Sequence, residues 1–164
     1  MGILEEDIQA LGGKLVKVVR FCTDEVERQR AEPPAVCWML EAWLDAIRAY
    51  ERTEPFTIRL GPDLLTLARW AKLIEPEKNR DGFRSYMVRV GSQSCPHPAE
   101  VPTLMAQFHA EIPARTPEEN YLAFETIHPF GDGNGRTGKI LYNWLKQSLF
   151  RPQMPPNFFG CSNP

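Results

Sequence analysis

The sequence lacks the features that mark several common protein classes. Its 164 residues contain only four cysteines, with no C-x-x-C pair and no neighbouring cluster of histidines, which argues against a zinc site or a disulfide framework. The formal net charge is only −2, so we expect no broad basic surface for nucleic acid or for anionic membranes. No apolar run approaches the length of a membrane span. We expect free, structural thiols at Cys22, Cys37, Cys95 and Cys161.

Recognisable targeting signals are also missing. The stretch MGILEEDIQA has no basic region and no long apolar run of the kind that a secretory signal peptide needs. Glu6 stands where a myristoylation signal has Ser or Thr. We therefore expect a cytoplasmic protein, with export by a route that leaves no such signal as the alternative.

The composition that remains is that of one globular domain, mostly helical. Hydrophobic residues make up 43% of the chain and charged residues 24%, enough for one sizeable core. Apolar residues recur with helical spacing in several segments. The clearest start is Thr116, followed by Pro117 and Glu119, which together form a capping box. We predict helices over about 35–50, 61–73, 101–112, 117–127 and 136–149.

Three segments break this helical pattern. In DGFRSYMVRVGS, residues 81–92, apolar and polar residues alternate between glycines, which predicts a short β-hairpin. Residues 1–35 are harder to assign, since LVKVV suits a helix or a strand; we treat them as an N-terminal helical extension. Residues 151–164 are rich in proline and are predicted to follow the surface in extended form. The whole chain, 1–164, is predicted to form a single domain with its core at about 36–150.

The glycine-rich stretch HPFGDGNGRTGK, residues 128–139, carries most of the chemical information. Gly133, Gly138 and Lys139 match much of a Walker A phosphate loop. However, Ile140 stands where that loop has the Ser or Thr that binds magnesium, and a capped helix precedes the stretch instead of a buried strand. No alternation of strands and helices elsewhere would build the parallel sheet. The Walker match is therefore interpreted as coincidental.

The stretch makes better chemical sense when it is followed from His128. The backbone N–H groups of Gly133, Asn134 and Gly135, at the start of a helix, would form an anion hole. Asp132 beside it can hold Mg²⁺ that bridges phosphate oxygens. The side chains of His128, Arg136 and Lys139 would then supply a general base and two cations. Such a set is suited to nucleophilic attack on a bound phosphate.

The same residues resemble the signature of the Fic family, H-x-F-x-[D/E]-G-N-G-R-x-x-R. The match covers His128, Phe130, Asp132, Gly133, Asn134, Gly135 and Arg136. Looser features follow the order seen in the family: Gly82-Phe83-Arg84, then Cys95-Pro96-His97-Pro98, then a helix that begins VPTLM. Together they cover about residues 36–150.

The resemblance implies an all-α, Fic-like helical bundle with a small β-hairpin flap beside the active-site loop. It implies a protein adenylyltransferase that transfers AMP from ATP, with Mg²⁺, to the Ser, Thr or Tyr hydroxyl of a target protein. His128 would deprotonate the hydroxyl, Asp132 would bind Mg²⁺, and Phe130 would anchor the loop in the core. Gly133, Asn134, Gly135, Arg136 and Lys139 would bind the nucleotide phosphates. A flap centred on 82–91, with Gly82, Phe83, Arg84, Val88 and Val90, would hold the target backbone by strand addition.

The chain departs from the family pattern at Lys139, where the second arginine is expected. Lysine lacks the planar fork of arginine, so the exchange implies weaker ATP binding, a different donor, or the absence of an inhibitory glutamate. Transfer of phosphate, UMP or phosphocholine, or a non-catalytic nucleotide- or protein-binding module, are the alternatives. The unaltered Gly-Asn-Gly favours AMP transfer.

The resemblance also raises the question of restraint. The inhibitory helix of the family reads [S/T]-x-x-x-E-[G/N], and the nearest match, residues 23–28, ends in Arg28 and offers Glu27 as a weak inhibitory candidate. If Glu27 does not inhibit, the enzyme is constitutively active or is inhibited by a separate, antitoxin-like protein. His97 and His109 are interpreted as structural or exposed. Glu125, one turn before His128, is interpreted as a surface carboxylate, with orientation of His128 as the alternative.

Overall fold

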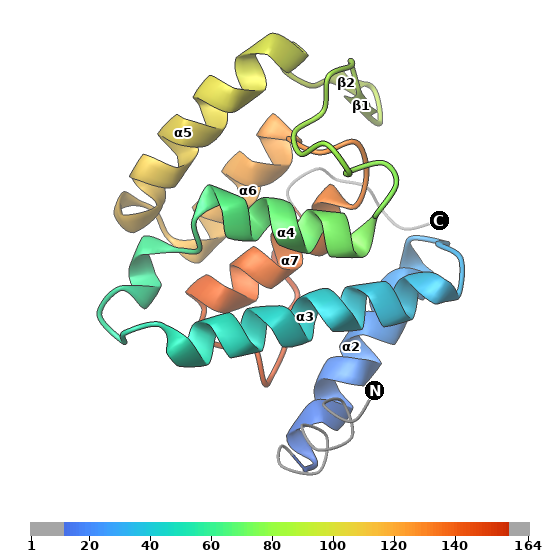
Figure 1. Cartoon of the computed structure of the whole chain (residues 1–164), viewed down its shortest axis with the longest axis vertical. Helices are drawn as coiled ribbons and strands as arrows, with labels where there is room; N and C mark the ends of the chain where they lie inside the picture. The colour runs from blue at the N-terminus through green and yellow to red at the C-terminus, as the bar shows by residue number, and fades with distance from the viewer. Residues whose placement is uncertain (1–11, 158–164) are drawn as a thin grey trace.

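The computed structural model describes residues 12–157, which form a helical bundle with one small β-hairpin (Figure 1). Residues 1–11 and 158–164, with Cys161 and the predicted signal-free start, lie outside the described part. The α-helices are α2 (Lys14–Arg28), α3 (Pro34–Arg52), α4 (Leu64–Ile74), α5 (Val101–Glu111), α6 (Pro117–Ile127) and α7 (Asn134–Leu145). Short 3-10 helices are η1 (Ile58–Leu60), η2 (Pro98–Glu100) and η3 (Ile112–Ala114). The predicted all-α architecture is confirmed.

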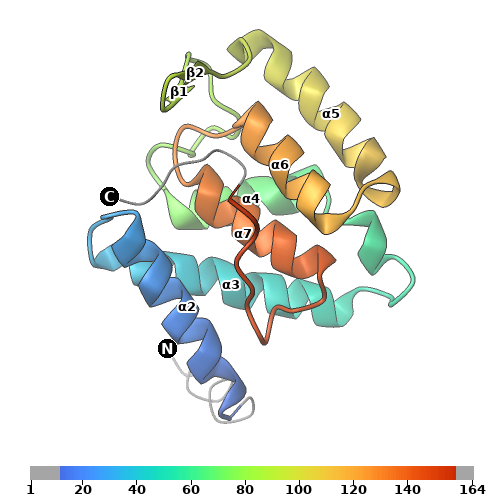
Figure 2. The ribbon, with the colours of Figure 1, turned by 180° about the vertical axis from the view of Figure 1, so that it is seen from behind.

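Helix α7 occupies the middle of the bundle, as the view from behind shows (Figure 2). It packs against α6, α4 and α3, while α2 packs against α3 and α5 packs against α6. One cluster of buried side chains joins α3 to α7 and the loop after α6: Trp43, Trp70, Phe108, Phe124, Ile140 and, from the loop, Phe130. One continuous core therefore holds both helices that flank the glycine-rich loop.

Capping residues set the helix starts close to the predicted ones. The Glu119 N–H donates to Thr116 Oγ1 (3.2 Å), and the Thr116 N–H donates to Glu119 Oε2 (2.8 Å), so α6 runs from 117 to 127 as predicted. Helix α4 begins later than expected, because Asp63 caps it through the Thr66 N–H (2.7 Å).

Helix α7 is displaced toward the N-terminus compared with the predicted range of 136–149. It starts at Asn134, directly after Gly133, which has a left-handed backbone (φ 70°). It ends at Leu145 because Gln147 adopts a left-handed conformation (φ 55°) and the Ser148 N–H reaches back to the Asn143 carbonyl (2.9 Å).

The β-hairpin is shorter than predicted and begins later in the chain. Strand β1 (Arg89–Val90) pairs antiparallel with β2 (Gln93–Ser94). Residues 81–88 are not part of the ladder, since the Arg84 N–H bonds to the Pro129 carbonyl (2.9 Å) in the glycine-rich loop. The alternation in 81–92 thus marked a segment attached to that loop rather than a strand.

The two ends of the described chain lie against the bundle. In α2, Leu15, Val18 and Cys22 are buried at helical spacing, which settles the assignment of LVKVV as helix. Past α7, residues 152–157 have no regular structure, as the proline-rich composition predicts. Asn143 holds this segment, donating to the Gln153 carbonyl (3.0 Å) and accepting from the Gln153 N–H (2.7 Å). Cys22, Cys37 and Cys95 are free thiols.

Candidate active site

The glycine-rich loop connects α6 to α7 and is anchored at both ends. His128 ends α6 in a left-handed conformation (φ 51°, ψ 62°), and its N–H donates to the Phe124 carbonyl (3.0 Å). Phe130 is fully buried, and its ring packs on Phe124 and Phe83 with centroids 6.3 and 5.6 Å away. Phe130 therefore anchors the loop in the core, as expected.

The start of α7 presents free backbone donors. The Asn134 side chain is turned back, accepting from the Phe130 N–H and donating to the Phe130 carbonyl, both at 2.9 Å. No side chain caps α7, and its first helical bond runs from the Thr137 N–H to the Gly133 carbonyl (2.9 Å). The N–H groups of residues 134–136 are therefore left for an anion. A Cβ at residue 133 would lie 2.7 Å from Ile74 Cγ2, so the tight turn here needs glycine.

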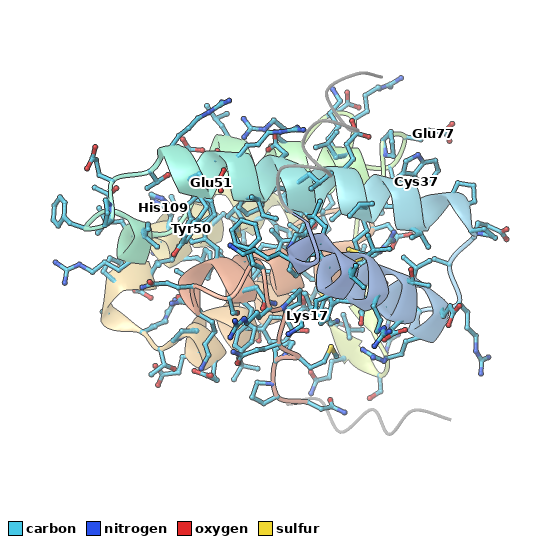
Figure 3. All side chains as sticks on the ribbon, turned by 90° about the horizontal axis from the view of Figure 1, so that it is seen from below. Lys17, Cys37, Tyr50, Glu51, Glu77 and His109 are labelled. Carbon is cyan, nitrogen blue, oxygen red and sulfur yellow. The ribbon has the colours of Figure 1, made fainter. Side chains whose placement is uncertain are left out.

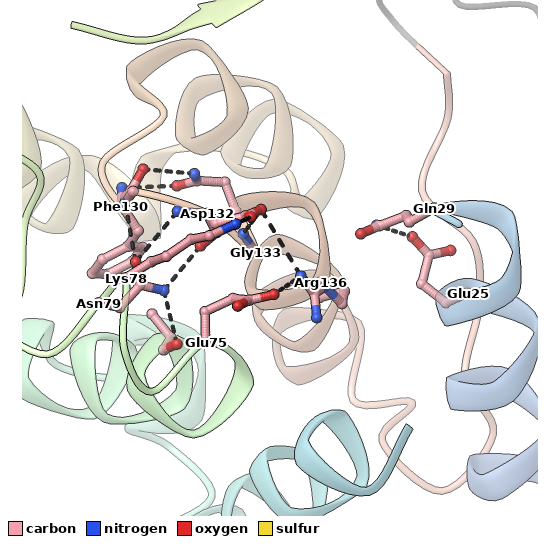
Figure 4. Close-up of polar contacts among 12 residues, drawn as sticks. Glu25, Gln29, Glu75, Lys78, Asn79, Phe130, Asp132, Gly133 and Arg136 are labelled. Carbon is pink, nitrogen blue, oxygen red and sulfur yellow. Dashed lines mark hydrogen bonds and ion pairs between the residues drawn. The ribbon is translucent and has the colours of Figure 1, made fainter. Parts of the chain in front are cut away.

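Asp132 lies beside these donors in a charged network (Figure 4). Its carboxylate pairs with Lys78 and accepts from the Gly133 N–H (2.7 Å). Burial raises the pKa of Asp132, but the bonds from Lys78 and Gly133, with the charges of Lys78 and Arg136, outweigh burial and leave that pKa below its ordinary value. Asp132 is therefore ionised at neutral pH and half-exposed, which suits a cation shared with phosphate oxygens.

Arg136 offers the strongest signal for a bound anion. Only 2% of the residue is exposed, and its Nη2 pairs with Glu75 Oε1 at 2.6 Å. Its Nε and Nη1 atoms are buried without a hydrogen-bond partner among the described residues. A buried guanidinium with unused donors is costly unless a ligand completes its bonds. Its place next to the free N–H groups of α7 fits a phosphate.

Lys139 is buried and already paired. Its Nζ lies 2.6 Å from Glu25 Oε1 of α2, and the two residues are 7% and 1% exposed. Glu25 also binds Arg28 (2.6 Å) and Gln29 (2.5 Å). The glutamate that contacts the motif is therefore Glu25. The weak inhibitory candidate Glu27, two residues later in α2, is exposed.

Helix α2 reaches the anion site itself. The Gln29 Nε2 atom lies 3.3 Å from the position that a Cβ on Gly135 would take. Figure 4 shows Glu25 and Gln29 extending from α2 toward the start of α7. The end of α2 thus stands where the phosphates of a nucleotide would approach the loop.

Asn79 supports the loop and was missed by the sequence analysis. It is 1% exposed and donates to the carbonyls of Ala71 and Asp132, both at 2.9 Å. Its Oδ1 accepts from the N–H groups of Gly131 (3.0 Å) and Asp132 (3.3 Å). The run EPEKNR around it is as polar as a surface loop, so no local pattern marks this asparagine.

The residues expected in the target-binding flap separate into two groups. Arg84 is 4% exposed and donates to the carbonyls of His128 (2.7 Å), Pro96 (2.7 Å), Tyr86 (3.0 Å) and Ile127 (3.3 Å). Together with Phe83, it supports the loop from behind, and Gly82 precedes them with a left-handed backbone (φ 92°). Val88 and Val90 belong to the partly exposed hairpin segment.

His128 lies at the loop entrance with its side chain partly buried. Burial lowers the pKa of His128, assisted by the charge of Arg84 and opposed by the Glu125 carbonyl and Asp132. Nδ1 has no hydrogen-bond partner among the described residues. The ring is therefore neutral at pH 7 and able to accept a proton.

Glu125 is not the surface carboxylate that the sequence suggested. Its Oε1 is buried without a hydrogen-bond partner in the described chain, and burial raises the pKa of Glu125 to about 7. The charge of Lys139 opposes this rise and that of Glu25 adds to it. Glu25 is ion-paired with Lys139, and the charges of both act on the nearby Glu125.

Comparisons with known proteins agree with this geometry. The model of the Fic/DOC family matches residues 63–145, about half of the chain. The chain is 35% identical over 83 residues to the protein adenylyltransferase Fic of Culex quinquefasciatus, and 37% identical over 83 residues to the proteins of that name from Drosophila willistoni and Drosophila melanogaster. Each match covers 45% of this chain and 16% of the relative, so only a small part of those proteins is represented.

The chain therefore belongs to the Fic/DOC family, and the family supports a transferase of the Fic type. In the described residues, no helix is long and apolar enough to cross a membrane. Within 12–157, no group of three or more His, Cys, Asp or Glu side chains is placed to hold a metal ion. A divalent cation at Asp132 would therefore need phosphate oxygens or water as its other ligands.

Proposed function

We propose that this protein is an adenylyltransferase that transfers AMP from ATP to a hydroxyl side chain of a target protein. The observation that carries the proposal is the buried Arg136 in the first turn of α7, two of whose nitrogens have no hydrogen-bond partner among the described residues. His128 stands at the other end of the same loop with a lowered pKa. The names of the relatives support the same activity.

In this mechanism, neutral His128 accepts the proton of the target hydroxyl as its oxygen attacks the α-phosphorus of ATP. The new oxygen–phosphorus bond forms as the bond to the bridging oxygen breaks, and pyrophosphate leaves with the electron pair. The N–H groups of residues 134–136 and the free nitrogens of Arg136 hold the phosphate oxygens. Asp132 would hold Mg²⁺, which neutralises phosphate charge when bound.

The target protein would bind along the hairpin. The ladder has only two residues in each strand, and the target would pair with the outer edge of β1 near Val90; the Val88 carbonyl already accepts from the Cys95 N–H (3.2 Å). Arg84 and Phe83 are occupied with the loop and contribute to the flap by positioning it. We place this reaction in the cytoplasm, with no role for nucleic acid or membrane.

Restraint forms part of the proposal. Glu25 on α2 occupies Lys139, the second cation of the motif, and Gln29 lies against Gly135. ATP phosphates would have to displace these side chains, so α2 holds the described enzyme in a restrained state. A separate inhibitory protein is then unnecessary for restraint, although one would act on the same helix.

A donor panel tests the proposed activity. The Glu25→Gln variant, which lacks the proposed restraint, and a lysate of its host are incubated with ATP labelled on the α-phosphate or on the γ-phosphate, and with labelled UTP or CDP-choline; label that persists with Glu25→Gln/His128→Ala is assigned to host enzymes and subtracted. AMP transfer predicts label on protein from α-labelled ATP only. Label from the γ-phosphate, UTP or CDP-choline would show that the enzyme transfers a different group, the alternative raised by lysine at position 139. No label with any donor would favour a non-catalytic binding module.

A further inference from the structure

A polar cavity lies at the opposite end of α7 from the motif loop. Its volume is about 520 Å³, and its described lining comes from the start of α2, the end of α7 and the segment that follows (Figure 2). Because α7 has 12 residues, its two ends are about 18 Å apart. No motif residue is among the described residues that line the cavity. It is therefore separate from the candidate active site.

The charge of this cavity is unlike that of the whole chain. Lys14, Lys17, Lys146 and Arg151 line it, and none of its described lining residues is acidic. The whole chain has a net charge of −2, so this basic cluster is local. Figure 3 labels Lys17 on α2 in the view from below. Four cations around one hollow repel one another, and a bound anion would relieve that repulsion.

Most of these cations are not neutralised within the described chain. Between described residues, Lys14, Lys17 and Arg151 form no ion pair; Lys14 lies over the Phe150 ring, 5.7 Å from its centroid. Lys146 pairs with Glu118 (3.2 Å) outside the lining and stays exposed. Three positive charges are therefore available to a ligand, two from α2 and one from the segment after α7.

Neutral donors add to this set. Gln147 and Gln153 line the cavity with their polar side chains. The first turn of α2 has no acidic residue and its start has no side-chain cap among residues 12–157, so its positive end adds to the charge of the cavity. The volume lies in the range of small-molecule sites, about 300–1,000 Å³. Several cations with amide donors around such a volume favour a phosphate group over a single carboxylate.

We propose that this cavity binds a phosphorylated small molecule. Lys14 and Lys17 contact its phosphate from α2, and Arg151 contacts it from the segment after α7. The ligand would thereby tie α2 to the end of α7. Because Glu25 lies on α2, binding would favour the state in which Glu25 pairs with Lys139; this consequence rests on the proposed restraint, whereas the binding site does not.

The test is a titration of the full chain, first with inorganic phosphate and then with pyrophosphate. Binding is monitored through the ¹H–¹⁵N chemical shifts of the backbone amides. We expect saturable shifts at residues 13–17 and 146–153, separate from shifts at 132–139 that report the motif loop. The double variant Lys14→Glu/Lys17→Glu should weaken the first set at least about fivefold and leave the second set unchanged. If the motif loop does not bind phosphate, only the shifts at residues 132–139 would be lost, so failure of the proposed function is distinguished from failure of this second site.

The matched control is Arg52→Glu/Lys72→Glu, which changes the net charge equally at exposed positions elsewhere. It should bind pyrophosphate at residues 13–17 as the unaltered chain does. Equal weakening in both variants, or no saturable shift at residues 13–17 and 146–153, would overturn the proposal. So would shifts there with phosphatidylserine vesicles or a short RNA but none with phosphate or pyrophosphate. The milder pair Lys17→Gln/Arg151→Gln provides the same test if the charge reversal unfolds the protein.

Discussion

Lys139 of α7 and Glu25 of α2 form a buried ion pair with 2.6 Å between Nζ and Oε1. In the sequence, Lys139 is the departure from the family pattern and Glu27 is the weak inhibitory candidate. In the folded chain, Glu25, half a helical turn before Glu27, forms the ion pair with Lys139. Lysine at this position thus has an acidic partner after all, and α2 is linked electrostatically to the motif.

We expect Glu25→Gln to tighten binding of a non-hydrolysable ATP analogue about tenfold, which is about 1.4 kcal/mol. The substitution removes the carboxylate that competes with phosphate for Lys139. Isothermal titration calorimetry measures the affinity. The variant should be less stable without nucleotide, because Lys139 loses its buried partner, and should recover stability when the analogue binds.

The control for this experiment is Glu27→Gln on the exposed face of the same helix. It should leave affinity and stability close to those of the unaltered protein. If Glu25→Gln binds the analogue no more tightly than Glu27→Gln, α2 does not restrain the site.

Arg84→Lys should lower both stability and transferase activity. Arg84 donates to four carbonyls, including that of His128, and lysine cannot reproduce this planar set. We expect a loss of about 2–4 kcal/mol in the free energy of unfolding, since buried carbonyls would lose their donors. Denaturant unfolding measures it, with exposed Arg89→Lys as the control. Equal stability of the two variants would show that Arg84 does not hold the loop.

Asn79→Asp should displace the loop although the side chain keeps its size. A carboxylate cannot donate to the Ala71 and Asp132 carbonyls, and it would repel the nearby Asp132 carboxylate. We expect kcat to fall at least about tenfold, because the catalytic loop loses its geometry. The control is exposed Arg80→Ala in the same segment. Unchanged kcat in Asn79→Asp, at unchanged fold, would contradict a positioning role.

Glu125 predicts a pH dependence of stability. Burial raises the pKa of Glu125 from 4.5 to about 7, so the folded state binds this proton more tightly than the unfolded state does. The contribution of Glu125 is therefore most favourable below about pH 4.5, and it is lost as pH rises to about 7. Glu125→Gln removes that loss.

The stability of Glu125→Gln minus that of the unaltered protein should thus grow between about pH 5 and pH 7, by on the order of 2 kcal/mol, and then level off. Thermal unfolding at a series of pH values measures this difference. A difference that stays constant, or that shrinks as pH rises, would contradict a raised pKa at Glu125.

The sequence predicted best what depends on local chemistry. The Thr116 capping box fixed the start of α6, and the motif residues predicted the loop that Phe130 anchors. Prediction from the sequence failed where contacts between residues far apart in the chain determine the local structure. The partner of Arg84 is the loop backbone more than 40 residues away, so the alternation in 81–92 could not reveal the true strands. Asn79 and Glu25 were unmarked because charged residues surround them in the chain, and Glu125 was interpreted as a surface carboxylate; only packing buries these groups.

The central claim is that His128 drives AMP transfer at the loop. It is tested most directly by mass spectrometry of the protein and of host proteins after incubation with Mg-ATP, with Glu25→Gln compared with Glu25→Gln/His128→Ala. We predict that Glu25→Gln adds AMP to a hydroxyl side chain, and that the double variant, still folded and still binding the ATP analogue, adds none. An AMP adduct that persists without His128, or its absence from Glu25→Gln when the nucleotide is bound, would contradict the account.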